Sequence, residues 1–239
     1  MQQIMSQIRA AVDSYQLIQS GDRIAVSISG GKDSLVLLCA LANMRKFLPM
    51  KYDLVAITVD PCFDNIQTDF RQVEELCRRL QIKYEIRRSQ LGNIIFEQRK
   101  ESNPCSLCAR MRRGILHDMS KKHNCNKLAL GHHFDDVIET ILMGMLYGGQ
   151  VQTMMPKLHS TNFEGMELIR PMYLIREDDI KHWRDYNDLH FIQCACRFTD
   201  TCTTCRTDGS SPSKRMEIKN LIASLKQTNP FIEGNIFKS

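Results

Sequence analysis

The stretch that decides the fold is IAVSISGGKDS, residues 24–34. Its first half is an apolar run of the kind that forms a strand buried on both faces of a sheet. Two glycines follow, and from Asp33 onward the apolar residues recur at helical spacing. Glycines between a strand and a helix let backbone amides approach an anion, and the helix N-terminus adds partial positive charge. The stretch therefore predicts a parallel strand that ends in a phosphate-binding loop.

The side chains of this loop suit a phosphate ligand. Lys32 supplies a cation, and hydroxyl groups are available to phosphate oxygens. The spacing matches neither the Walker pattern nor Gly-x-Gly-x-x-Gly, and a bare Gly-Gly alone would more often be a tight turn capped by Asp33 or Ser34. The candidate nucleotide-binding residues of the loop are Ser29, Gly30, Gly31, Lys32, Asp33 and Ser34.

Strands and helices alternate along the chain. Apolar runs predict further strands at residues 54–59, 83–88, 127–130 and 168–171, and helical spacing predicts helices at residues 4–19, 63–80, 134–145 and 178–189. We expect an α/β fold: a doubly wound parallel sheet with a short N-terminal helical segment and Cys-bearing loops at residues 99–113 and 193–213. Ligands of such sheets bind at the carboxyl ends of strands, where Ser29, Asp60 and Gly131 lie.

We expect three parts: an N-terminal helix (1–20), a nucleotide-binding domain (21–190) and a Cys-rich loop with a helix (191–239) packed on that domain. The 239 residues are 43% hydrophobic and 25% charged, which is typical of a soluble globular protein. No apolar run approaches the roughly 18 residues that span a bilayer, and the amphipathic N-terminus carries Asp13, unlike a signal peptide. Ten cysteines in a chain of this kind indicate metal or redox chemistry in the cytoplasm, with no membrane partner.

A second polar motif, GHHFDD at residues 131–136, follows the strand at 127–130. His132, Asp135 and Glu139 are spaced so that they could share one face. Because Mg²⁺ favours carboxylate oxygens together with substrate phosphates, Asp135 and Asp136 are candidates to hold it against a nucleotide. The alternative is a helix start whose acidic residues complement the dipole. We favour the site, because this turn is expected at the same sheet edge as the glycine loop.

SGGKDS resembles the pyrophosphate loop of the PP-loop (adenine nucleotide α-hydrolase-like) ATPases, which cleave ATP between the α and β phosphates and adenylate a substrate. Further motifs make the family resemblance more specific. They are LGHHFDD at 130–136, MLYGG at 145–149, MPKL at 155–158, CSLCARMRRGIL at 105–116 and IRP at 169–171. Together these motifs, over about residues 20–225, resemble the tRNA 2-thiocytidine synthetase (TtcA) family. The resemblance implies an ATP-dependent tRNA thiolase acting on cytidine 32. It places Asp60, Gly131 and His132 beside the nucleotide and makes Asp135 and Asp136 catalytic.

In that family two cysteines of a first pair and one later cysteine hold a 4Fe–4S cluster, leaving one iron open to bind sulfide. The resemblance assigns Cys105 and Cys108 as ligands and catalytic residues. The third ligand stays open: alignment on apolar neighbours favours Cys194, alignment on spacing favours Cys202, and Cys196 is a further candidate. On its own, Cys-x-x-Cys could also bind zinc or act as a redox pair. The leftover late cysteines are candidates for a zinc site or for persulfide carriers.

Charge is unevenly distributed. Residues 71–122 hold thirteen Lys and Arg against six Asp and Glu, an excess larger than the +5 of the whole chain. Such a cluster around the first Cys pair favours a tRNA partner, whose binding would be sensitive to salt. Other expected partners are a sulfur donor (a cysteine desulfurase or sulfide) and a second copy of the chain. Two alternatives remain: a lysidine-type tRNA ligase without a cluster, and a non-catalytic, zinc-stapled RNA-binding protein.

Overall fold

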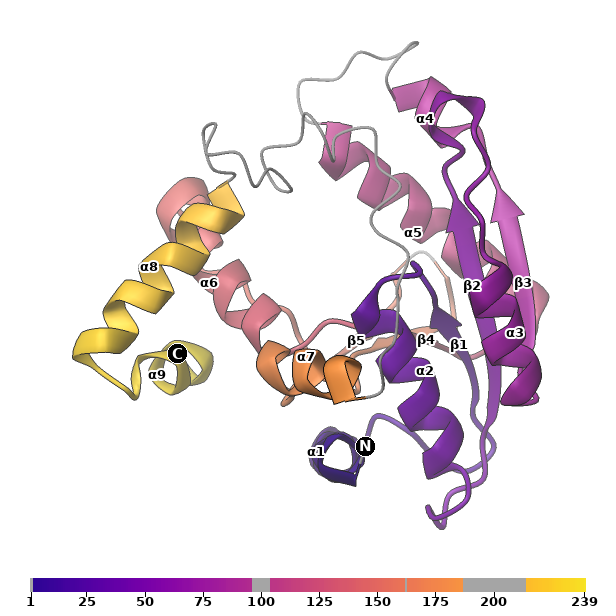
Figure 1. The fold of residues 1–239 in the computed structure, drawn as a ribbon, viewed down its shortest axis with the longest axis horizontal. Helices are drawn as coiled ribbons and strands as arrows, with labels where there is room; N and C mark the ends of the chain where they lie inside the picture. Colours follow the sequence, from indigo (N-terminus) through magenta and orange to yellow (C-terminus); the bar gives the residue numbers. More distant parts are fainter. Residues whose placement is uncertain (1, 96–103, 162, 187–213) are drawn as a thin grey trace.

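The computed structural model describes residues 2–95, 104–161, 163–186 and 214–239 (Figure 1). Its sheet has six strands in the order β3-β2-β1-β4-β6-β5. The strands are β1 (Arg23–Ser27), β2 (Asp53–Asp60), β3 (Lys83–Arg88), β4 (Lys127–Ala129), β5 (Lys157–His159) and β6 (Glu167–Ile169). The five strands from β3 to β6 run parallel, and β5 pairs antiparallel with β6 at the edge. The expected parallel sheet is confirmed, and the antiparallel edge strand is an addition that the sequence analysis missed.

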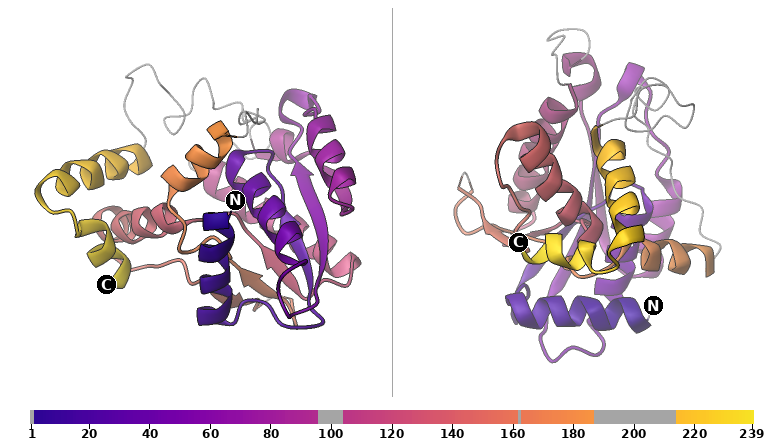
Figure 2. Two further views of the ribbon diagram at one scale, coloured as in Figure 1. Left: turned by 60° about the horizontal axis from the view of Figure 1, so that its bottom comes forward. Right: turned by 90° about the vertical axis from the view of Figure 1, so that its left-hand side faces the viewer.

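Helices cover both faces of this sheet (Figures 1 and 2). They are α1 (Gln2–Tyr15), α2 (Lys32–Met44), the 3-10 helix η1 (Phe63–Asn65), α3 (Arg71–Arg79), α4 (Leu91–Asn93), α5 (Pro104–Lys122), α6 (Phe134–Gly148), α7 (Glu177–Tyr186), α8 (Lys214–Thr228) and α9 (Ile232–Lys238). Alternate residues of the central strands feed two cores, because side chains alternate across a strand. Ile24 and Leu54 join the cluster under α1, α2, α3 and α7, whereas Ala25 and Val55 join the cluster under α5.

The predicted helix at residues 63–80 is wrong in its first half, since only α3, from Arg71, is α-helical. The cause is Asp60, whose carboxylate accepts hydrogen bonds from the backbone N–H of Cys62 (3.1 Å) and of Thr68 (3.0 Å). The Thr68 hydroxyl donates to the same carboxylate at 3.2 Å. These bonds fold residues 61–68 into a loop at the end of β2.

The predicted loop at 99–113 is also wrong from residue 104 onward, because α5 begins at Pro104. Proline suits the first helical position, where its missing N–H has no partner to lose. The helix is stabilised by Leu107, Leu116 and Met119, which are buried in the core cluster beneath it. Apolar residues at helical spacing along α5 favour a helix, although the Cys and Arg residues of this segment suggested a loop.

The chain ends in two helices, α8 and α9, which both pack on α6. The predicted extension of α7 to residue 189 lies outside the described residues. So do the late cysteines, Cys194, Cys196, Cys202 and Cys205, and with them the proposed zinc site. Within the described ranges, none of the helices is both long enough and apolar enough to cross a membrane.

Candidate nucleotide and catalytic site

The glycine loop is shaped by its own two serines. The Ser34 hydroxyl accepts the N–H of Ser29 (3.2 Å) and donates to the carbonyl of Gly31 (2.9 Å), while the Ser29 hydroxyl accepts the N–H of Gly31 (3.3 Å). Gly30 has a φ of +87°, which a residue with a side chain rarely adopts. Gly31 caps α2 without a side-chain hydrogen bond. The amides of the first turn of α2 are therefore left to an external anion.

The glycine loop and the 131–136 turn meet at one sheet edge, because β1 and β4 are neighbours in the sheet although β2 and β3 intervene in the chain. Gly131 lies directly against the loop. A Cβ at this position would lie 3.1 Å from the carbonyl carbon of Asp33 and 3.2 Å from the backbone nitrogen of Ser34. Only glycine allows this approach without a shift of the loop. The contact places the turn at the topological switch point where such sheets bind ligands.

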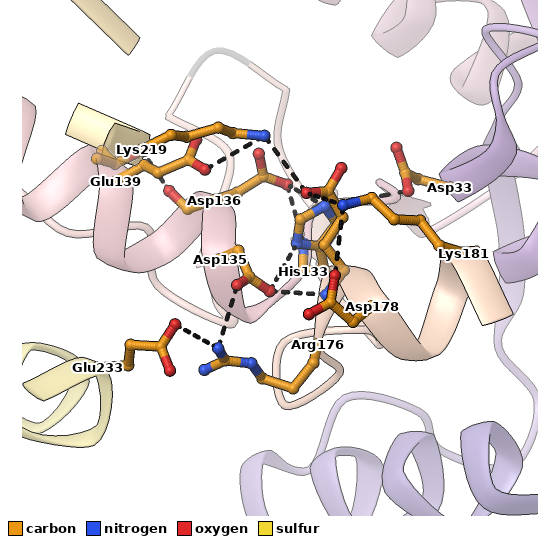
Figure 3. A network of polar contacts seen from close by, with 12 residues as sticks. Asp33, His133, Asp135, Asp136, Glu139, Arg176, Asp178, Lys181, Lys219 and Glu233 are labelled. Atoms are coloured by element: carbon orange, nitrogen blue, oxygen red, sulfur yellow. Dashed lines mark hydrogen bonds and ion pairs between the residues drawn. The ribbon is translucent and has the colours of Figure 1, made fainter. Parts of the chain in front are cut away.

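His133 sits at the centre of an acidic group at this edge (Figure 3). Its ring nitrogens lie 3.6 Å from a carboxylate oxygen of Asp135, 3.5 Å from one of Asp136 and 4.0 Å from one of Asp33. Burial alone would lower the pKa of His133, but these carboxylates together hold it above its usual value. Burial likewise acts to raise the pKa of Asp135, yet His133 and the N–H of Glu177 keep it below its usual value. The half-buried carboxylates of Asp135 and Asp136 therefore share His133 as a partner.

The pKa of the neighbouring residue, His132, shifts in the opposite direction. Burial, helped by the nearby Arg170 and Arg215 and opposed by Asp136, lowers the pKa of its imidazole to about 4. Its Nδ1 atom is buried and has no hydrogen-bond partner within the described chain. His132 is therefore neutral near pH 7 and has an unused hydrogen-bonding atom at the edge of the site.

One interpretation of the site needs correction. His132, Asp135 and Glu139 do not share one helical face, because α6 begins only at Phe134. Asp136, not Asp135, shares a partner with Glu139, because Arg215 lies 3.6 Å from Asp136 and 3.0 Å from Glu139.

Asp135 faces α7 instead. Its carboxylate accepts the N–H of Glu177 at 2.7 Å and lies 3.5 Å from Arg176. Asp60 does lie at the carboxyl end of β2, as expected, but both of its oxygens are engaged by the loop at 61–68. In this structure its carboxylate holds that loop in place.

Comparisons with known proteins identify the family of this chain. The family model of the PP-loop domain (ATP_bind_3) matches residues 1–197. A curated tRNA-cytidine(32) 2-sulfurtransferase of Geotalea uraniireducens is 36% identical over 99% of this chain and 89% of its own length. Another, of Syntrophotalea carbinolica, is 37% identical over 95% of this chain and 83% of its own length. The chain belongs to this PP-loop family.

A solved structure shares the fold of this family member. It is described as the U34-tRNA thiolase NcsA from Methanococcus maripaludis with its 4Fe-4S cluster. The TM-score is 0.77 at 24% identity, over 99% of this chain and 76% of that one. At this identity the likeness supports the α/β architecture.

Of the candidate cluster ligands, Cys108 is the one whose side chain is described. It is half-buried and packs against the core cluster beneath α5. Cys105 lies one helical turn earlier in α5, but its side chain is outside the description, as is Cys194. The start of α5 lies beyond the carboxyl ends of the strands (Figure 1). The first Cys pair and the glycine loop are thus at the same end of the sheet.

The carboxylates of the site form no ready-made metal cage. No group of three His, Cys, Asp or Glu side chains that could hold a metal ion occurs in the part of the chain described. Asp135 and Asp136 are already paired with His133, Arg176 and Arg215. A magnesium ion here would need nucleotide phosphates among its ligands, which is how proteins usually hold it.

Several site residues were missed by sequence reasoning. Glu177, at the start of α7, binds Lys32 of the glycine loop at 3.1 Å, Lys181 at 3.2 Å and Lys219 at 3.4 Å. Burial would raise the pKa of Glu177, but the three ammonium groups lower it to about 2. The acidic run at 177–179 is the sequence signal that could have drawn attention to Glu177. Nothing local marks Arg215 or Lys219, which reach the site only through the packing of α8 on α6.

Proposed function

We propose that this chain is an ATP-dependent tRNA sulfurtransferase. The observation that carries the proposal is that the glycine loop contacts the Gly131–Asp136 turn and that α5 starts at the same end of the sheet (Figure 1). Curated relatives of nearly the same length, named tRNA-cytidine(32) 2-sulfurtransferases, support the substrate. The proposed target is therefore cytidine 32 of tRNA, modified in the cytoplasm.

ATP would bind with its phosphates on the amides of the loop and of the first turn of α2, next to Lys32. Asp135 and Asp136 would hold Mg²⁺ against those phosphates. The oxygen of the base carbonyl attacks the α-phosphorus, the bond to the β-phosphate breaks, and pyrophosphate leaves with the bonding electrons. The base oxygen is now part of a good leaving group. A sulfur nucleophile then attacks the carbon that carries this oxygen, and AMP departs with the oxygen.

Sulfur delivery is assigned to the cysteines. Cys105, Cys108 and one late cysteine, Cys194 in preference to Cys196 or Cys202, would hold a 4Fe–4S cluster. Such a cluster with three protein ligands supplies an open iron that can bind sulfide. Anaerobic purification tests this assignment: we expect a brown protein with about four irons per chain. A colourless protein with one zinc and no iron would contradict it.

The partners follow from the same chemistry. The tRNA would approach over the basic elements around α5, so its binding should weaken steeply as salt rises. The anticodon loop is single-stranded, so its base can unstack into the site. A cysteine desulfurase or sulfide would supply the sulfur, and a second copy of the chain is a further proposed partner.

The reaction products test the function directly. Purified protein, tRNA, ATP and a sulfur source should yield AMP and pyrophosphate in step with thiolated tRNA, and omission of tRNA should abolish both. Release of ADP would contradict the mechanism. Release of AMP that depends on lysine instead of sulfur would indicate a lysidine-type ligase.

A further inference from the structure

Helix α8 brings two cations, Arg215 and Lys219, to the carboxylates of Glu139 and Glu177. Lys219 Nζ lies 3.4 Å from Glu177 and 3.6 Å from Glu139, and Arg215, one turn earlier, also contacts Glu139. Both residues lie beyond residue 197, where the match to the PP-loop family model ends. Figure 3 shows Lys219 extending from α8 past Asp136 toward Lys181.

Lys219 is close to the glycine loop because it shares a carboxylate with the loop. One oxygen of Glu177 is bound by Lys32 and the other by Lys219. The two ammonium groups therefore lie on either side of a single carboxylate, although they come from opposite ends of the chain. An anion that sits on the loop beside Lys32 has Lys219 as a near neighbour.

Lys219 is held loosely compared with a tight ion pair on the same helix. Its two contacts exceed the usual 2.7–3.2 Å of an N–H···O hydrogen bond. Lys226, two turns further along α8, is 2.9 Å from Glu233. An ammonium group has three donors and a flexible four-carbon stem. Lys219 can thus turn from its carboxylates to a stronger anion without disrupting the packing of α8.

We propose that Lys219 binds the β- and γ-phosphates of ATP together with Lys32, and so holds the pyrophosphate that leaves. Glu177 keeps both ammonium groups beside the loop until the phosphates arrive. Lys219 donates hydrogen bonds to non-bridging phosphate oxygens and transfers no proton. The proposal rests on nucleotide binding at the glycine loop, as the proposed function does, but not on tRNA or sulfur.

The test compares binding of inorganic pyrophosphate with Mg²⁺ and binding of AMP, by calorimetry on the full chain. For Lys219→Met we expect pyrophosphate affinity to fall about tenfold, which corresponds to about 1.4 kcal/mol. AMP affinity should stay unchanged, because AMP lacks both phosphates. Lys219→Arg should keep most of the pyrophosphate affinity, and Lys226→Met is the matched control that should keep all of it. Unchanged pyrophosphate affinity in Lys219→Met, or an equal loss for AMP, would overturn the proposal.

A measurement on the native protein covers the case in which the neutral variant does not fold. Acylation of lysines, followed by mass spectrometry, reports which ammonium groups a ligand protects. Pyrophosphate should slow the labelling of Lys219 and leave Lys226 unaffected, whereas AMP should protect neither. Equal labelling of Lys219 with and without pyrophosphate would contradict its role. Because neither ligand requires tRNA, this result is independent of whether the chain thiolates tRNA.

Discussion

At the scale of single residues, Gly131 is the contact that joins the two halves of the site. A methyl group there would press on the backbone of Asp33 and Ser34 at 3.1–3.3 Å. Gly131→Ala should therefore displace the glycine loop, and overpacking of this kind costs about 1–3 kcal/mol. We expect ATP affinity, measured by equilibrium binding, to fall about tenfold, equivalent to about 1.4 kcal/mol. Gly114→Ala is the control, since nothing lies within 4 Å of its added methyl group; an equal loss there would refute the explanation.

Some features of single residues could be predicted from the sequence, and others could not. The glycine loop could be placed because its residues are contiguous and each has a local role. Asp60 was correctly placed at a strand end, but its engagement by Thr68 depends on how the seven intervening residues, 61–67, fold. The contacts of Arg215 and Lys219 with Glu139 depend on tertiary packing between distant helices. No local pattern encodes such contacts.

At the scale of elements, α6 carries the site turn at its start and the C-terminal helices on its side. Phe134, the first residue of α6, stacks on Phe237 of α9 with ring centroids 4.3 Å apart. Phe237 also contacts Tyr173 at 5.1 Å. The aromatic contact therefore stabilises the start of α6, directly after His133.

Loss of this contact should destabilise the protein. Phe237→Ala removes a half-buried ring and its stacking, which we expect to lower the free energy of unfolding by about 2 kcal/mol. Urea denaturation measures the change. Phe231→Ala is the matched control, because that ring is 74% exposed, and surface changes usually stay within about 0.5 kcal/mol. Equal effects of the two substitutions would show that α9 does not stabilise α6 in this way.

The element α5 illustrates a different limit of prediction. The Cys pair and the arginines around it suggested a loop, yet Leu107, Leu116 and Met119 are buried and the segment is helical. The chemistry of these residues predicts a functional site but does not determine the backbone conformation. A helix start can carry the same residues.

At the scale of the whole molecule, charge is divided between two regions. Of the thirteen basic residues of 71–122, the eleven that the structure describes lie on α3, β3 and α5. The acidic group of Asp33, Asp135, Asp136 and Glu177 lies among α2, α6 and α7 (Figure 1). The rest of the chain outside 71–122 has a net charge of −2. This division suits a polyanionic tRNA approaching one region while the nucleotide and its cations are held in the other.

The central claim, tRNA thiolation, is tested most directly by mass spectrometry of nucleosides from total tRNA. Cells that lack this protein should contain no 2-thiocytidine. The native gene should restore it, and a Cys108→Ser variant should not. Loss of a different thiolated base would keep the chemistry but correct the target. An unchanged content of 2-thiocytidine and of every other thiolated nucleoside would contradict the account.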